Sequence, residues 1–352
     1  MKAYIVAGGT GGHINSALAI GLRLEQEGHQ VCYLSGKRKL DLQLFEGKNV
    51  IHLDAKPLSG KSPLTIMKNI FANLRVFFKV FNLFKNERPD FVFGAGGYVC
   101  GPTLGSAYFL KIPVYILEQN SVFGLTNKLL QGLATKIFTH FEETKGLKEE
   151  FSAKVRVSGN PLRDSFYRSK TSANRVEGVT KVLIFGGSLG AKAINEFAEK
   201  WLSLTRDNKL EVTHQTGGKI GEAPLEIAAN VQYNRLNYIE NMAQELFNAD
   251  FVICRGGAST VAELRLVKRP VLIIPLMIHR DKHQWVNAKA LQQEAEFPVF
   301  VEPSLEKLAA ENFRELEEMI EKSKSYKGTE SLDEKHDQAT EMIVEEIKTD
   351  VL

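Results

Sequence analysis

The chain has 352 residues, of which 43% are hydrophobic and 25% are charged, and its formal net charge is +3. This is the composition of a globular protein, and the length favours two domains over a single core. The small net charge argues against a general nucleic-acid-binding protein. The three cysteines, Cys32, Cys100 and Cys254, lie in apolar surroundings without metal-ligand spacing, as expected of thiols in a reducing compartment. No export signal is predicted at the N-terminus.

The chain opens with a predicted strand, residues 3–7, that runs into Gly8-Gly9-Thr10-Gly11-Gly12-His13 and then into a helical pattern. The loop lacks the strict dinucleotide fingerprint, and no acidic residue clearly ends the next strand, which counts against a dehydrogenase. His13 can exchange a proton near neutral pH, so it is a candidate general base. The alternative is that His13 only caps the helix or hydrogen-bonds to the loop.

Residues 56–88 combine apolar side chains at helical spacing with an excess of basic residues. Charged residues interrupt every window long enough for a transmembrane helix. Two interpretations remain: an amphipathic helix packed on the sheet, or a surface that inserts apolar side chains into an anionic membrane while basic residues meet the headgroups. The residues of this predicted membrane patch are Ile70, Leu74, Phe77, Phe78, Phe81, Lys68, Arg75 and Lys79.

Two further predicted strands, residues 91–93 and 113–117, end in a glycine loop at 94–98 and a polar loop at 118–120. Because the carboxyl ends of parallel strands meet at one edge of a sheet, both loops should lie beside loop 8–13. An isolated Asn120 would most often serve a turn. Its place beside two other loops makes it a candidate ligand contact.

A turn cluster at residues 158–161 predicts a linker, after which a second α/β series begins at 181–185 and again runs into glycines. The parallel with the opening of the chain indicates two domains of the same type. We therefore predict an α/β fold of two doubly wound, Rossmann-like domains facing each other across a cleft. The predicted domains are 1–160, on which the last helix (335–352) packs back, and 161–334.

Within the second series, a predicted strand at 251–254 ends in Arg255-Gly256-Gly257, and a helix is expected to start at Ser259 or Thr260. Glycines ahead of a helix N-terminus let a phosphate approach unpaired backbone N–H groups, so a nucleotide diphosphate would fit. Glu263, one turn later, could accept hydrogen bonds from both hydroxyls of a ribose. The alternative is a capping box in which Glu263 reaches back to the Thr260 amide. A polar loop at 279–284 follows the next strand and should reach the same edge.

Glycine-rich and polar motifs follow one another along almost the whole chain: GGTGGH (8–13), GAGGYVCGP (94–102), EQN (118–120), GLTNK (124–128), GNPLR (159–163), GGSLGA (186–191), HQTGG (214–218), YIENM (238–242) and RGGASTVAE (255–263). In this order they resemble the motifs of the MurG family of peptidoglycan N-acetylglucosaminyltransferases. The resemblance implies the glycosyltransferase B fold, with the acceptor, lipid I, bound by the N-terminal domain and UDP-GlcNAc by the C-terminal one. It also implies production of lipid II at the cytoplasmic face of the bacterial inner membrane, by a peripheral enzyme without a metal or other cofactor.

The resemblance further implies roles for individual residues. Glu263 resembles the ribose-binding glutamate, Ser188 the serine that meets the phosphates, and Ile239 the residue whose backbone reads uracil. Gln284 resembles a glutamine near the sugar hydroxyls, and Arg163 the arginine of the GNPxR motif. The implied UDP-GlcNAc contacts are Thr10, Gly11, Gly12, Asn120, Arg163, Ser188, Ile239, Ala258, Ser259, Thr260, Val261, Ala262, Glu263 and Gln284.

An inverting transfer requires a base for the acceptor hydroxyl and stabilisation of the charge on the leaving diphosphate. We assign the base to His13 and the stabilisation to helix N-termini near Ser188 and Thr260, aided by Arg163. Other classes remain open. They are a UDP-GlcNAc epimerase of the same architecture, a non-catalytic nucleotide-binding or membrane-scaffold protein, and a related transferase with a diacylglycerol acceptor.

Overall fold

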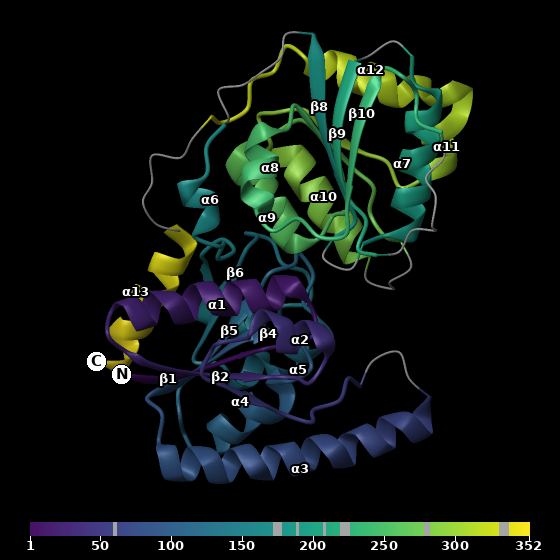
Figure 1. Ribbon diagram of the computed structural model, residues 1–352. Helices are drawn as coiled ribbons and strands as arrows, with labels where there is room; N and C mark the ends of the chain where they lie inside the picture. The colour runs from purple at the N-terminus through teal and green to yellow at the C-terminus, as the bar shows by residue number, and fades with distance from the viewer. Residues whose placement is uncertain are drawn as a thin grey trace. The chain divides into compact units, whose positions relative to one another are not determined.

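The computed structural model describes residues 1–58, 62–171, 178–187, 190–206, 209–218, 226–277, 282–330 and 338–352. The chain forms two compact units (Figure 1). Unit 1 comprises Met1–Asp164 and His336–Leu352, and unit 2 comprises Ser165–Lys335. The first unit extends past the boundary expected at residue 160 because Ser16 Oγ lies 3.1 Å from both Asn160 Oδ1 and the Pro161 carbonyl oxygen.

The described strands of unit 1 form a parallel sheet in the order β3-β2-β1-β4-β5-β6-β7. They are β1 (Lys2–Ala7), β2 (Gln30–Ser35), β3 (Val50–His52), β4 (Phe91–Gly96), β5 (Val114–Glu118), β6 (Lys136–Thr139) and β7 (Val155–Val157). The strand order reverses between β1 and β4. In doubly wound sheets, ligands bind beyond the carboxyl ends of the strands at this reversal.

Successive residues of a strand point to opposite sides of the sheet, and in unit 1 both sides carry buried apolar residues. Helices therefore cover both faces of this sheet. On β1, Ala3 and Ile5 face a cluster that includes α1 and α13, whereas Tyr4 and Val6 face α3 and α4. The helices of unit 1 are α1 (Gly11–Gln26), α2 (Lys39–Leu44), α3 (Pro63–Glu87), α4 (Cys100–Phe109), α5 (Leu125–Leu130), α13 (Gln338–Val351) and the 3-10 helices η1 (Gln131–Leu133) and η2 (Glu149–Lys154).

The last helix, α13, adds to the core of unit 1. Ile343 and Ile347 are buried in the cluster that also holds α1 side chains. At its end, Asp350 pairs with Lys136 at 2.8 Å and accepts a hydrogen bond from Tyr115 Oη at 3.2 Å. Apolar burial and these polar contacts together explain why the C-terminal segment returns to the first unit.

Unit 2 repeats the arrangement with a parallel sheet, in the described residues, of order β10-β9-β8-β11-β12-β13. Its strands are β8 (Val179–Phe185), β9 (Lys209–Gln215), β10 (Val231–Leu236), β11 (Phe251–Cys254), β12 (Val271–Ile273) and β13 (Val299–Val301). Its helices are α6 (Ser165–Arg168), α7 (Lys192–Leu204), α8 (Met242–Asn248), α9 (Ala258–Val267), α10 (His283–Glu294), α11 (Leu305–Ala309), η3 (Ala310–Phe313) and α12 (Arg314–Ser323). The prediction of two doubly wound α/β domains is confirmed.

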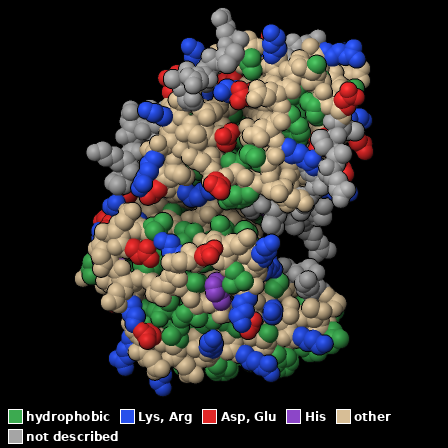
Figure 2. Space-filling model, viewed as in Figure 1, with side chains coloured by type: hydrophobic (Ala, Val, Ile, Leu, Met, Phe, Trp, Pro, Cys, Tyr) green, Lys and Arg blue, Asp and Glu red, His purple; other side chains and the backbone are tan. Residues whose placement is uncertain are grey.

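Helix α3 packs on the rest of unit 1 mainly through residues outside the predicted membrane patch. Its buried side chains are Val76, Val80 and Phe84. Of the predicted membrane patch, Ile70, Leu74 and Phe78 are exposed together with Lys68, Arg75 and Lys79, whereas Phe77 and Phe81 are only partly exposed. In the space-filling view, hydrophobic and basic side chains alternate along the edge that α3 forms (Figure 2).

Phe77 is partly covered because its ring packs edge-to-face on Phe109 of α4, with centroids 5.7 Å apart. Phe109 itself is 70% exposed and extends the apolar surface onto α4. In the ranges that the structure describes, no helix is both long and apolar enough to cross a bilayer.

Candidate functional site

The glycine loops after β1 and β4 interlock. The Gly8 N–H lies 3.4 Å from the Gly96 carbonyl oxygen. Gly97 has a φ of +94°, and a Cβ there would lie 2.0 Å from the Gly8 carbonyl oxygen. Only glycine fits this approach, so the two loops lie in close contact and form one rim at the carboxyl edge of the sheet.

His13 lies on this rim, in the first turn of α1. Thr10 is the N-cap, and its Oγ1 accepts the His13 N–H at 3.4 Å. The ring Nδ1 lies 3.4 Å from the Gly8 carbonyl oxygen, which can only accept, so Nδ1 carries the proton and Nε2 is the basic nitrogen. A Cβ at Gly96 would come within 2.7 Å of the ring, so glycine makes room for the imidazole.

Asp41, on α2, is a part of the rim that the sequence analysis missed. Its buried carboxylate accepts hydrogen bonds from the Gly9 N–H at 2.8 Å, the Arg38 N–H at 3.2 Å and Tyr98 Oη at 3.1 Å. Burial, together with the Asp41 charge, raises the pKa of Tyr98 to about 12, so the hydroxyl stays a donor. The signal in the sequence was a lone carboxylate in a short helix a few residues after a strand that ends at Ser35.

The third predicted loop reaches the same place. Gln119 Nε2 donates to the Gly12 carbonyl oxygen at 3.3 Å, which joins the end of β5 to the start of α1. Asn120 is half-buried, and both its N–H and its side-chain amide donate to Glu118 Oε1. The structure therefore brings loops 8–13, 94–98 and 118–120 together. Arg163, also in unit 1, is half-buried next to the end of that unit.

In unit 2, the Gly256-Gly257 turn leads from β11 directly into α9. Gly257 is the N-cap and α9 begins at Ala258, so Thr260 lies inside the first turn. A capping box starting at Thr260 is therefore wrong, because that residue is not at the N-cap. Glu263 lies in the next turn and is 7% exposed.

The first turn of α10 packs against this turn. A Cβ at Gly256 would lie 2.3 Å from the Gln284 carbonyl oxygen, so only glycine allows the approach. Asn287 Nδ2 donates to the Gly256 carbonyl oxygen at 3.2 Å, and Gln284 Oε1 accepts the Leu276 N–H at 2.9 Å. Gln284 thus lies beside the start of α9, as the sequence predicted for two neighbouring strand ends.

Gln215, at the end of β9, links three loops of this edge. Its Nε2 donates to the Gly187 carbonyl oxygen at 3.1 Å, and its Oε1 accepts the Ile239 N–H at 2.7 Å. Of the Ile239 backbone, which is predicted to read uracil, the N–H is therefore bonded to Gln215. Ser188 and residues 279–281 of the predicted polar loop lie outside the described residues.

His214 precedes Gln215 and is fully buried. Burial, with a contribution from Arg235, lowers its pKa to about 4. Its Nδ1 lies 2.7 Å from Tyr233 Oη and its Nε2 lies 3.1 Å from Asn195 Oδ1. The neutral ring therefore belongs to a network that fixes the strand end just ahead of Thr216, whose carbonyl oxygen accepts from Asn195 Nδ2 at 3.0 Å.

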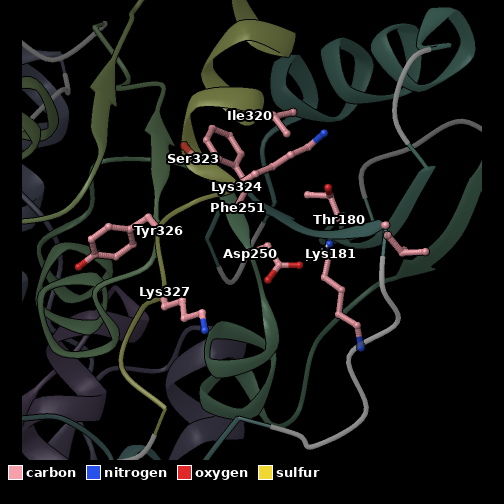
Figure 3. Close-up of a pocket in the computed structure, with 11 residues that line it drawn as sticks. Thr180, Lys181, Asp250, Phe251, Ile320, Ser323, Lys324, Tyr326 and Lys327 are labelled. Atoms are coloured by element: carbon pink, nitrogen blue, oxygen red, sulfur yellow. Dashed lines mark hydrogen bonds between the residues drawn. The ribbon is translucent and has the colours of Figure 1, made fainter.

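A pocket of about 420 Å³ lies elsewhere in unit 2 (Figure 3). It is lined by residues at the amino ends of β8 and β11, including Lys181 and Asp250, and by the end of α12 and the chain that follows it, including Lys324 and Lys327. The strand ends that carry the candidate residues are the opposite, carboxyl ends, so this pocket is not the predicted site. Within the described residues, no group of three or more His, Cys, Asp or Glu side chains could hold a metal ion.

Two family descriptions match successive parts of the chain. Residues 3–139 match the glycosyltransferase family 28 N-terminal domain, and residues 181–343 match the glycosyltransferase family 28 C-terminal domain. A crystal structure of MurG from Acinetobacter baumannii superposes with a TM-score of 0.71 at 28% identity, covering 99% of both chains. UDP-GlcNAc 2-epimerase from Neisseria meningitidis, at 16% identity and a TM-score of 0.59, shares the fold. The fold and these matches define a two-domain glycosyltransferase of the B type.

The sequence relatives narrow this class. A protein of Myxococcus xanthus is 35% identical over 339 residues, which are 92% of this chain and 87% of that protein. A protein of Polaromonas naphthalenivorans is 37% identical over 305 residues, 82% of each chain. Both are named UDP-N-acetylglucosamine–N-acetylmuramyl-(pentapeptide) pyrophosphoryl-undecaprenol N-acetylglucosamine transferase. The chain belongs to this MurG family of glycosyltransferase family 28.

Proposed function

We propose that this protein transfers N-acetylglucosamine from UDP-GlcNAc to the 4-hydroxyl of the muramyl sugar in lipid I, undecaprenyl-pyrophosphoryl-MurNAc-pentapeptide, with inversion at the anomeric carbon. The product is lipid II, for peptidoglycan synthesis. The names of the related transferases support this donor and acceptor. The observation that carries the proposal is the start of α9, whose N-cap is Gly257. Helix N–H groups and the positive end of the helix dipole stabilise a diphosphate leaving group there.

The donor residues are assigned mainly to unit 2. Residues 258–262 contact the diphosphate and the sugar through the first turns of α9, and Glu263 accepts hydrogen bonds from the ribose hydroxyls. Gln284 meets the sugar hydroxyls, and its position beside the start of α9 supports this role. Recognition of uracil is assigned to the backbone of Ile239, whose N–H donates to Gln215 Oε1 at 2.7 Å in this structure.

Unit 1 supplies the acceptor side. His13 Nε2 takes the proton of the acceptor hydroxyl as that oxygen attacks and the bond to the diphosphate breaks. The position of His13 on the rim, where Gly96 makes room for its ring, supports this role. Further donor contacts are assigned to Thr10, Gly11, Gly12 and Asn120 on the same rim.

The enzyme acts at the cytoplasmic face of the bacterial inner membrane, as a peripheral protein on an anionic surface. An acceptor that carries an undecaprenyl chain is embedded in the bilayer, so the enzyme must approach it there. Exposed apolar side chains beside exposed basic ones on α3 support this attachment, since apolar insertion and charge attraction add. Nucleic acid is not a partner in this proposal.

The decisive test offers labelled UDP-GlcNAc with lipid I, with diacylglycerol, or with no acceptor. We expect label in lipid II only. A second sugar nucleotide formed without acceptor would instead identify an epimerase, and labelled glycolipid would identify the diacylglycerol enzyme. Transfer to none of them would refute the proposal.

A companion variant tests the donor site. Glu263→Gln should weaken UDP binding about tenfold or more, because hydrogen bonds to a charged acceptor are worth roughly 1.5–3 kcal/mol each. Glu294→Gln on α10, an exposed carboxylate paired with Arg265, is the matched control and should leave binding unchanged. Equal calorimetric affinities of the Glu263 variant and the unchanged protein would remove Glu263 from the site.

A further inference from the structure

Glu118 ends β5 and is a buried carboxylate that the reaction above does not use. Its side chain is 3% exposed. Oε1 accepts hydrogen bonds from the Asn120 N–H at 3.0 Å and from Asn120 Nδ2 at 3.2 Å. Oε2 accepts from the Gly124 N–H at 2.9 Å and from Asn127 Nδ2 at 3.0 Å. One carboxylate thus accepts from four donors of residues 120–127, in the loop after β5 and the first turn of α5.

These bonds fix both ends of the loop that follows β5. At its start, the backbone and the side chain of Asn120 point to the same oxygen, so the direction of the Asn120 amide is set. At its end, Gly124 is the N-cap of α5, and Asn127 lies in the first turn of that helix. Asn127 Nδ2 also donates to the Leu117 carbonyl oxygen at 2.9 Å, which ties α5 back to β5.

The four donors favour an ionised carboxylate. A carboxylate accepts through both oxygens and donates nothing, whereas a glutamine in its place would turn an NH2 group towards two N–H donors. Burial raises the pKa of Glu118, so the charged form costs free energy that the loop hydrogen bonds only partly offset. A buried charge is often no net gain in stability. The function of these hydrogen bonds is therefore sought in the loop residues that they position.

We propose that Glu118 is a positioning residue of the transfer reaction, which sets the Asn120 amide and the loop that joins the rim of His13. The link to the rim is the bond of Gln119 Nε2 to the Gly12 carbonyl oxygen, next to His13 in the chain. The inference rests on the proposed function, because Asn120 and His13 have their roles there. Glu118 itself touches no substrate in this arrangement.

Kinetics of Glu118→Gln, Asn120→Ala and the double variant test the proposal. Glu118→Gln should lower kcat/KM about tenfold or more, since two charge-assisted hydrogen bonds are lost. If Glu118 acts through Asn120, the kcat/KM of the double variant should lie within about twofold of the kcat/KM of the less active single variant. Asp90→Asn is the control, because Asp90 accepts the Lys2 N–H at the opposite, amino end of the same sheet. Effects that multiply, or a Glu118→Gln enzyme within about twofold of the parent, would overturn the proposal.

Hydrogen exchange separates this inference from the proposed function. The amides of Asn120 and Gly124 should exchange faster in Glu118→Gln, while the amides of β1 and β4 keep their protection. This result does not depend on activity, so it still decides the loop role if the parent protein fails to glycosylate lipid I. Unchanged exchange at Asn120 and Gly124 would refute the inference, and faster exchange throughout unit 1 would show a general structural role instead.

Discussion

Mild acid should destabilise unit 2 through one histidine. His214 is fully buried, and its pKa falls from the ordinary 6.5 to about 4 because burial and the Arg235 charge disfavour the imidazolium. At intermediate pH, the unfolded chain binds a proton at this position and the folded chain does not. The contribution of His214 to stability is therefore complete above about pH 6.5 and is lost as the pH falls towards 4.

The two pKa values set the size of the effect. Between about pH 7.5 and about pH 5, proton linkage predicts a loss of about 2 kcal/mol in the free energy of unfolding. Glu199 acts in the opposite sense, because burial raises its pKa and its folded form favours the proton. The variant His214→Gln retains Glu199 and the other carboxylates. The difference in acid-induced stability loss between the parent protein and this variant therefore isolates the contribution of His214.

Tryptophan fluorescence during urea unfolding reports on this unit alone. The chain has 2 tryptophans, Trp201 and Trp285, and both belong to unit 2. His214→Gln should be less stable at about pH 7.5, because the imidazole packing is lost. Its further loss on acidification should be smaller than that of the parent protein by about 2 kcal/mol. Equal losses in the two proteins would refute the assignment to His214.

Two further predictions concern unit 1. Gly97→Ala should lower the free energy of unfolding by more than about 2 kcal/mol in circular dichroism melts, because its Cβ would meet the Gly8 carbonyl oxygen at 2.0 Å. Gly28→Ala, with a φ of +81° but nothing within 4 Å of the new Cβ, should cost only about 1 kcal/mol; equal costs would contradict the clash. Phe71→Ser with Phe78→Ser should lower sedimentation with anionic vesicles about tenfold, since both rings are more than half exposed. The control Leu204→Ser, at an exposed position of unit 2, should not lower sedimentation with these vesicles. Unchanged sedimentation of the Phe71/Phe78 double variant would show that α3 does not contact the membrane.

The repeated pattern of strand, glycine loop and helix was readable in the sequence because it depends on local chemistry. Glycines after an apolar run predict a tight turn, and the helical period that follows predicts the helix. This reasoning placed His13 and the start of α9 within a residue or two of their observed positions. It also brought Asn120 beside the first loop, because parallel strands share an edge.

The roles of Asp41 and Gln215 could not be predicted, because they depend on which donors the tertiary fold brings near. Two of the three donors to Asp41, the Gly9 N–H and Tyr98 Oη, come from other loops, and Gln215 meets the Ile239 N–H only after β10 has been added to the sheet. The sequence could not tell which side chains of α3 pack on the sheet, for a related reason. Helical periodicity shows that apolar side chains share a face, but two overlapping faces exist here, and packing on the sheet selected Val76 and Val80.

The two buried carboxylates of unit 1 explain why the donor diphosphate is assigned to unit 2. Loops at the carboxyl edge of a doubly wound sheet present an excess of backbone N–H groups, and these attract negative charge. In unit 1, Asp41 and Glu118 already accept from that edge, and Thr10 caps α1. In unit 2, α9 starts from Gly257, which has no side chain with which to accept. This difference supports the proposal that an external diphosphate binds the first-turn amides of α9, and that the rim of unit 1 serves mainly the sugars and the proposed base, His13.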